Sequence, residues 1–129
     1  MVSTVERFSE VQLLNCYIVE AHPSDGWQVE SNEEEDDGTG NLCFMQPRTL
    51  QARLSVAGRM VEDMQLDPAS VVVDGIENET DLAFEARPER LYVVASGKVL
   101  WRSGVGPFQY DTKGLEAFLA QNWGQTSAL

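Results

Sequence analysis

The stretch VQLLNCYIV, residues 11–19, decides the fold class of this chain. It is apolar, contains β-branched and aromatic side chains, and is short for a helix. It therefore predicts a buried strand that ends before Pro23. A second apolar run, residues 71–74, predicts another buried strand. Buried strands of this kind usually lie in sheets whose faces are covered by helices, so the two runs together indicate an α/β protein.

Between the two predicted strands, apolar residues recur at helical spacing. Their separations of 4, 3, 4 and 3 predict the apolar stripe of an amphipathic helix: Leu50, Leu54, Ala57, Val61 and Met64. Pro47 suits the first position of this helix, and Asp67-Pro68 marks its end.

The remainder of the chain continues the alternation of strands and helices. Asn78 and Asp81 are suited to cap a short helix up to about residue 86. Residues 91–95 and 99–101 predict strands joined by Ser96-Gly97, which is a hairpin signal, and an apolar face predicts a last helix starting near Asp111. The order is strand, helix, strand, short helix, hairpin and helix, typical of an α/β layer with a mixed sheet.

Length and charge exclude several classes of protein. The chain has 129 residues, one domain's length, and carries 9 basic against 21 acidic residues, a net charge of −12. This net negative charge disfavours binding to nucleic acids and to anionic membrane surfaces. Without a long apolar run or a signal-peptide pattern, the sequence as written predicts a cytoplasmic chain with no membrane segment. Two cysteines are too few for a disulfide scaffold or a Cys-based zinc site, so no metal is expected.

Half of the net charge lies in one short segment. Residues 30–37 contain six acidic side chains, and Gly38-Thr39-Gly40 follows. Like charges packed this closely repel, so residues 31–41 predict a solvated acidic loop inserted into the domain. The run lacks the alternating oxygen ligands of a cation-binding loop.

One motif is far more specific than these patterns. The segment YIVEAHPSDGW, residues 17–27, closely resembles the strand and loop that follow the active-site helix in the iodothyronine deiodinase family. Further resemblances follow in family order: RTLQAR at residues 48–53, VVVD at 71–74, PERLYV at 88–93, and Gly106-Pro107 before an aromatic residue and Tyr110. The resemblance covers about residues 6–123, as a single deiodinase-like domain over residues 1–129 with the acidic loop as an insert.

This resemblance implies a thioredoxin-like fold and a reductive deiodination. In the family, a selenocysteine or cysteine attacks the iodine of an iodinated phenol such as a thyroid hormone, and a thiol reductant restores the enzyme without another cofactor. The nucleophile lies in a Ser-Cys-Thr-Sec-Pro-Pro type motif, which is absent from these 129 residues. We therefore expect a mixed sheet that lacks its first βα unit. We also expect the nucleophile to be encoded upstream of Met1, because the family's selenocysteine codon, UGA, is otherwise read as a stop codon. Family members are often membrane-anchored, and a homodimer is possible.

The resemblance also points to site residues. In a strand, Glu20 and His22 would project to one face, so the carboxylate can orient the imidazole for proton delivery to the ring carbon. Tyr17 has the opposite parity; it reaches Glu20 only if the strand kinks, and otherwise packs in the core. Ser24 and Asp25 either cap the loop or touch the substrate.

If the protein recognises an amino-acid carboxylate on its substrate, a positively charged side chain should bind it. Relatives often carry a basic or polar residue where this chain has Val105, and commonly a His where it has Pro47. Arg90 and Arg102 are the alternatives, although an arginine on an exposed strand is usually solvated.

Two other functions stay open at the level of sequence. A thiol oxidoreductase would use Cys16 or Cys43, but Cys16 is expected to be buried in an apolar strand and Cys43 follows the acidic run, so neither thiolate is favoured. A non-catalytic binding module, or truncated pseudoenzyme, would keep a phenol cleft without the nucleophile.

The resemblance makes two further predictions about the structure. The strands at residues 11–19 and 91–95 should not pair directly, because the family's first strand lies between them. The Arg87-Pro88 bond should be cis and lie near the Glu20–His22 end of the sheet.

Overall fold

A computed structural model of the chain describes residues 2–27 and 44–124. It divides into two compact units, one formed by residues 15–84 and the other by residues 1–14 and 85–129. The predicted acidic loop at residues 31–41 and Cys43 lie outside the described residues. The prediction of a single domain over residues 1–129 stays a prediction, and each unit is considered by itself.

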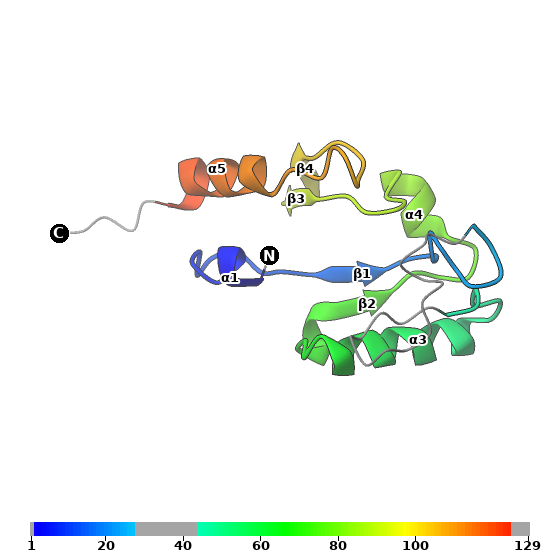
Figure 1. Cartoon of the computed structure of the whole chain (residues 1–129). Helices are drawn as coiled ribbons and strands as arrows, with labels where there is room; N and C mark the ends of the chain where they lie inside the picture. Colours follow the sequence, from blue (N-terminus) through cyan, green and yellow to red (C-terminus); the bar gives the residue numbers. More distant parts are fainter. Residues whose placement is uncertain (1, 28–43, 125–129) are drawn as a thin grey trace. The chain divides into compact units, whose positions relative to one another are not determined.

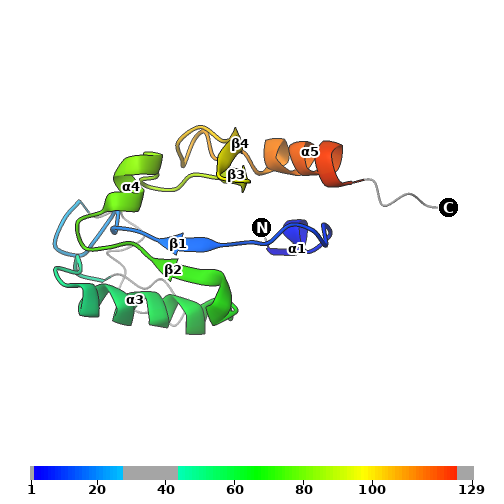
Figure 2. The same ribbon diagram turned by 180° about the vertical axis from the view of Figure 1, so that it is seen from behind.

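The unit of residues 15–84 is built on two parallel strands. Strand β1 (Asn15–Tyr17) pairs with β2 (Val71–Val73), and Cys16 lies opposite Val72. Helix α3 (Leu50–Asp63) lies along β2, as Figures 1 and 2 show from opposite sides. β1 is shorter than the predicted strand over residues 11–19, because it has a ladder partner only along the three residues of β2.

Helix α3 differs from the prediction in its first residue and in the side chains that it buries. Its N-cap is Thr49, whose hydroxyl accepts a hydrogen bond from the Ala52 amide at 3.1 Å, so Pro47 precedes the cap instead of opening the helix. The predicted apolar stripe is partly wrong: Leu50 and Leu54 are 46% and 45% exposed. The helix instead buries Arg53 and Ala57.

Arg53 can be buried because both terminal nitrogens of its guanidinium are hydrogen-bonded. One of its terminal nitrogens donates to the carbonyls of Asp74 at 3.3 Å and Gly75 at 2.6 Å, and the other donates to Oδ1 of Asn78 at 2.8 Å. A buried charge is tolerated only with such partners. Hydrophobic periodicity carries no signal of this kind, because the partners lie more than 20 residues away in sequence.

The predicted cap of the short helix is also wrong. Helix α4 spans Glu79–Phe84 and follows a 3₁₀ turn, η1 (Pro68–Ser70), and strand β2. Asn78 has a φ of 61°, a left-handed conformation unlike that of an N-cap residue. The carboxylate of Asp74 takes the capping role instead, accepting from the amides of Thr80 at 2.9 Å and Asp81 at 3.0 Å.

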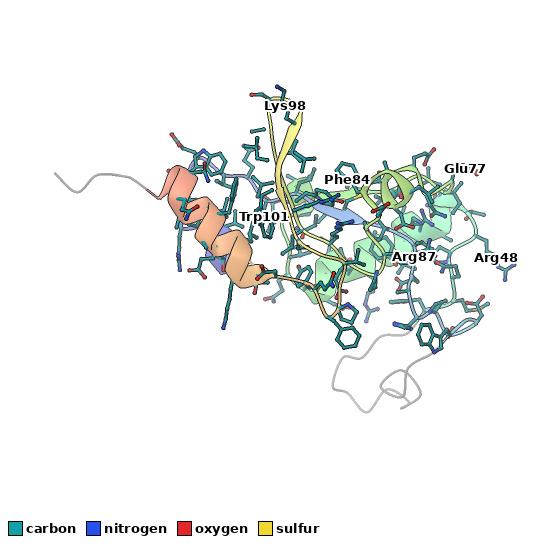
Figure 3. The ribbon with its side chains drawn as sticks, turned by 90° about the horizontal axis from the view of Figure 1, so that it is seen from above. Arg48, Glu77, Phe84, Arg87, Lys98 and Trp101 are labelled. Carbon is teal, nitrogen blue, oxygen red and sulfur yellow. The ribbon has the colours of Figure 1, made fainter. Side chains whose placement is uncertain are left out.

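The other unit confirms the predicted hairpin and last helix. Strand β3 (Tyr92–Ala95) pairs antiparallel with β4 (Lys98–Arg102), and the turn residues Ser96 and Gly97 both have positive φ, 51° and 72°. Figure 3 shows Lys98 at the tip of this hairpin. Helix α5 (Thr112–Trp123) is capped by Asp111, whose Oδ1 accepts from the Gly114 amide at 2.8 Å.

A hydrophobic core holds this second unit together. Two of its buried residues come from the start of the chain, where helix α1 spans Val2–Val5, and two come from α5: Val5, Phe8, Leu115 and Leu119. Trp101 of β4 and Trp123 of α5 pack against the cluster, and Trp101 is stacked on Phe118 with ring centres 6.3 Å apart. Val11 and Leu13, predicted to lie in the first strand, pack here as extended chain.

The described elements form a mixed α/β protein, consistent with the predicted thioredoxin-like fold. The described strands pair only as β1 with β2 and β3 with β4, so residues 11–19 and 91–95 share no ladder. A further strand between them stays a prediction. The Arg87-Pro88 bond is cis, as predicted, and Gly106-Pro107 is a second cis bond. The proximity of Pro88 to His22 stays a prediction as well. None of the helices described here is long and apolar enough to cross a membrane.

Replacing the Asp74 carboxylate tests its role in the unit of residues 15–84. Asp74→Ala leaves two amide groups of α4 without their acceptor and should lower the free energy of unfolding by about 1 to 3 kcal/mol. Urea unfolding followed by circular dichroism measures the loss. Asp63→Ala is the control, since it removes only the exposed pair with Arg59 and should change stability by at most about 0.5 kcal/mol. Equal losses in the two variants would contradict the capping role.

The same carboxylate predicts a dependence of stability on pH. Burial alone would raise the pKa of Asp74, but hydrogen bonds from Asp81, Thr80 and Gly75 together hold this pKa below its ordinary 3.8. The ionised group therefore contributes stability above pH 3.8, and this contribution is lost as the pH falls through the lower folded-state pKa. The difference between the wild type and Asp74→Ala should shrink over that acidic range.

Candidate functional site

The candidate site begins where β1 ends. The amide of Asp74 donates to the Tyr17 carbonyl at 2.9 Å, and residues 18–27 then continue without regular strand structure. Side-chain alternation therefore stops at Tyr17. The argument that placed Glu20 and His22 on one face needs a strand at residues 20–22, so it does not apply here. For the same reason, Tyr17 and Glu20 need not project to opposite faces. The Tyr17 hydroxyl donates a hydrogen bond to Oε1 of Glu20.

Burial changes the acidity of the Glu20 carboxyl. The side chain is half-buried, and burial raises the pKa of its carboxyl above the ordinary 4.5, because the charged form loses solvation. A carboxyl that holds its proton to higher pH serves better as a general acid near neutrality. The sequence indicates Glu20 through a motif. The structure adds a physical property, the raised pKa of its carboxyl.

His22 lies two residues further along the same loop. Its Nδ1 is 2.9 Å from the carbonyl oxygen of Trp27, and the two rings meet edge to face with their centres 5.1 Å apart. A carbonyl only accepts hydrogen bonds, so this contact assigns a proton to Nδ1 and fixes the orientation of the ring. The Trp27 carbonyl is thus one group that orients the imidazole, and the predicted contact with the Glu20 carboxylate stays a prediction.

Ser24 and Asp25 tie the loop to the chain just before α3. The Ser24 amide donates to the Phe44 carbonyl at 2.8 Å, and Oδ1 of Asp25 accepts from the Gln46 amide at 2.8 Å. This bond from Gln46 is the main cause that holds the pKa of Asp25 below its ordinary value. Arg48, which extends away from the ribbon in Figure 3, lies 3.6 Å from Oδ2 of Asp25. These contacts support the loop-capping alternative for Ser24 and Asp25.

Sequence reasoning missed Gln46, which contacts the main chain of Glu20 twice. Its Oε1 accepts from the Glu20 amide at 3.1 Å, and its Nε2 donates to the Glu20 carbonyl at 2.9 Å. Gln46 lies 26 residues after Glu20, beyond the acidic segment, in a stretch with no regular spacing. No sequence signal links the two residues.

Arg90 belongs to the other unit and is not the solvated arginine expected of an exposed strand. Its side chain is 8% exposed, its Nε donates to the Ser103 carbonyl at 3.0 Å, and its guanidinium lies over the Tyr92 ring at 5.5 Å. A terminal nitrogen is 3.4 Å from a carboxylate oxygen of Glu85. Binding of a substrate carboxylate by Arg90 stays a prediction. Arg102, on β4, is exposed.

Cys16 lies on β1 with an exposed side chain, so the prediction that it is buried is wrong. Its thiolate is nevertheless disfavoured: partial desolvation and then the negative charge of Asp74 raise the pKa of the thiol, more than a hydrogen bond with Thr80 lowers it. The described part of the chain contains no group of three or more potential metal-ligating side chains.

These observations define a mixed α/β protein of the thioredoxin-like class, with a half-buried acid and a histidine on the loop after β1. A model of the iodothyronine deiodinase family matches residues 3–123. The chain is 32% identical over 123 residues to the type II iodothyronine deiodinase of Fundulus heteroclitus and 33% identical over 129 residues to that of Mus musculus. The chain therefore belongs to the iodothyronine deiodinase family.

The alignments differ in how much of each protein they cover. They include 94% and 97% of this chain but only 44% and 46% of those two relatives. The chain thus spans less than half the length of the curated relatives it matches.

The raised pKa of Glu20 predicts how stability depends on pH. Because the folded-state pKa lies above 4.5, the neutral acid contributes stability below pH 4.5, and this contribution is lost as the pH rises through the folded-state pKa. Relative to Glu20→Gln, the wild type should therefore lose stability as the pH rises above 4.5, as measured by urea unfolding at several pH values. Glu62→Gln, on the exposed side of α3, controls for removing one charge from an acidic chain. A difference between wild type and Glu20→Gln that stays constant with pH would contradict the assignment.

Proposed function

We propose that this chain delivers the proton in the reductive deiodination of an iodinated phenol of the thyroid-hormone type. The observation that carries the proposal is the Tyr17–Glu20 hydrogen bond, in which burial raises the pKa of the carboxyl, followed two residues later by an oriented His22. Membership of the deiodinase family supports the substrate class. The printed names of the relatives refer to iodothyronines, so we propose an iodinated aromatic ring for this chain also.

The reaction requires two electrons and one proton at the ring carbon. With a thiol RSH as the reductant, an aryl iodide and two RSH give the deiodinated arene, the disulfide RSSR, one H⁺ and iodide. The carbon–iodine bond breaks, a carbon–hydrogen bond forms, and two thiols are oxidised to one disulfide. We propose that His22 delivers the proton to carbon, and that the Glu20 carboxyl, hydrogen-bonded to Tyr17 and with its pKa raised by burial, is a second acid on the same loop.

The electrons must come through a nucleophile that attacks iodine, and Cys16 is poorly suited to this role. The pKa of its thiol is raised, so little thiolate forms at neutral pH. We therefore propose a selenocysteine or cysteine supplied from outside these 129 residues, regenerated by an external thiol with no other cofactor. The same property of Cys16 argues against a thiol oxidoreductase that uses this residue.

Iodide release tests the proposal. The 129-residue chain by itself should release no iodide from an iodinated phenol at any thiol concentration. A fusion that places the preceding reading frame before Met1, with any UGA codon written as Cys, should release iodide. In that fusion, His22→Ala should reduce turnover by about 10² to 10⁴, the usual cost of removing a proton donor. Iodide is measured directly, with dithiothreitol as the reductant.

Cys16→Ser and Cys43→Ser are the matched controls and should leave the turnover of the fusion nearly unchanged. Iodide release by the short chain that disappears in either cysteine variant would overturn the proposal in favour of thiol chemistry. An inactive fusion that still binds an iodinated phenol, measured by calorimetry, would favour the non-catalytic binding module.

A further inference from the structure

We propose that Gln46 is a positioning residue that fixes the main chain of Glu20 and thereby holds its carboxyl against the Tyr17 hydroxyl. The placement of Glu20 is argued from geometry alone; its use as an acid rests on the proposed function. Gln46 touches neither the reacting atoms nor the Glu20 carboxyl in this structure. It acts through the backbone amide and carbonyl of Glu20, at 3.1 Å and 2.9 Å.

The need for Gln46 follows from the end of β1. Up to Tyr17 the main chain is held by β2, and the last of these bonds is the one from the Asp74 amide to the Tyr17 carbonyl. Glu20 lies three residues beyond that point, outside the ladder. A carboxamide offers a donor and an acceptor side by side, and it can bind the N–H and C=O of one residue at once, so the Gln46 side chain can replace a strand partner for Glu20.

Gln46 is itself held in place, which makes it a fixed support. Its own amide donates to Oδ1 of Asp25 at 2.8 Å, and two residues earlier the Phe44 carbonyl accepts from the Ser24 amide at 2.8 Å. The segment 44–46 and the loop 20–25 are therefore joined at three places, with Gln46 contributing both its main chain and its side chain. The Tyr17 hydroxyl holds the other end of Glu20. Both the backbone and the carboxyl of Glu20 are thus fixed, from different sides.

The proposal differs from a purely structural role in what it predicts for Tyr17. A contact that only stabilises the loop would alter the unfolding free energy and leave the Tyr17–Glu20 hydrogen bond unchanged in the folded protein. A positioning contact would weaken that bond even where the protein stays folded. The Cζ resonance of Tyr17, labelled with ¹³C, reports hydrogen bonding of its hydroxyl, and hydrogen exchange reports protection of the Glu20 amide.

The test compares Gln46→Met, which keeps the size of the side chain but neither hydrogen bond, with Gln51→Met, the same change at an exposed glutamine of α3. Gln46→Met should make the Glu20 amide exchange about tenfold faster and move the Tyr17 Cζ resonance toward that of free tyrosine. Exchange of the Asp74 amide, in the ladder, should not change. Gln51→Met should show none of these effects. A folded Gln46→Met protein in which the Tyr17 signal is unchanged would overturn the proposal.

A second variant keeps the test decisive if Gln46→Met does not fold. Gln46→Glu, ionised at pH 7, can still accept from the Glu20 amide but cannot donate to the Glu20 carbonyl. It should preserve protection of the Glu20 amide and still move the Tyr17 resonance, whereas an unchanged resonance would overturn the proposal. In the active fusion, Gln46→Met should lower kcat more than it raises KM. An inactive wild-type fusion would defeat the proposed function alone, because the spectroscopic result would stand without it.

Discussion

Asp74 is the residue on which the unit of residues 15–84 depends, because three parts of it each hold a different element. Its amide donates to the carbonyl of Tyr17 and so extends the pairing of β1 with β2. Its carboxylate accepts from two amides in the first turn of α4, and its carbonyl accepts from the buried Arg53 of α3. Buried polar groups must find partners at the end of a strand, and Asp74 satisfies groups from three elements at once.

The position of the candidate site follows from this arrangement. Because β1 ends at Tyr17, the following loop is free of the strict alternation of a strand and can bring Tyr17 and Glu20 together. The loop then needs other supports, which come from side chains. Gln46 holds the backbone of Glu20, Asp25 binds the main chain of Gln46, and the Trp27 carbonyl orients His22. The site is thus formed within one unit, by residues 17–27 and 44–48.

Agreement between sequence and structure is best where the signal is local. The Ser96-Gly97 turn and the start of α5 near Asp111 depend on residues within a few positions of one another, and both are as predicted. Agreement is worst where a polar partner lies far away. The stripe on α3 was misjudged because the burial of Arg53 depends on carbonyls more than 20 residues distant, and Gln46 was missed for the same reason.

The sequence by itself determined the family, the order of the elements, and the identities of Tyr17, Glu20 and His22 as candidate site residues, because these depend on short motifs and local periodicity. Only the tertiary structure decided which of them touch. It paired Tyr17 with Glu20, turned His22 to the Trp27 carbonyl, and supplied Gln46 and Asp74 as supports. The physical reason is that a hydrogen bond is specified by the positions of two polar groups in space, whereas a periodic pattern specifies only which side of an element is apolar.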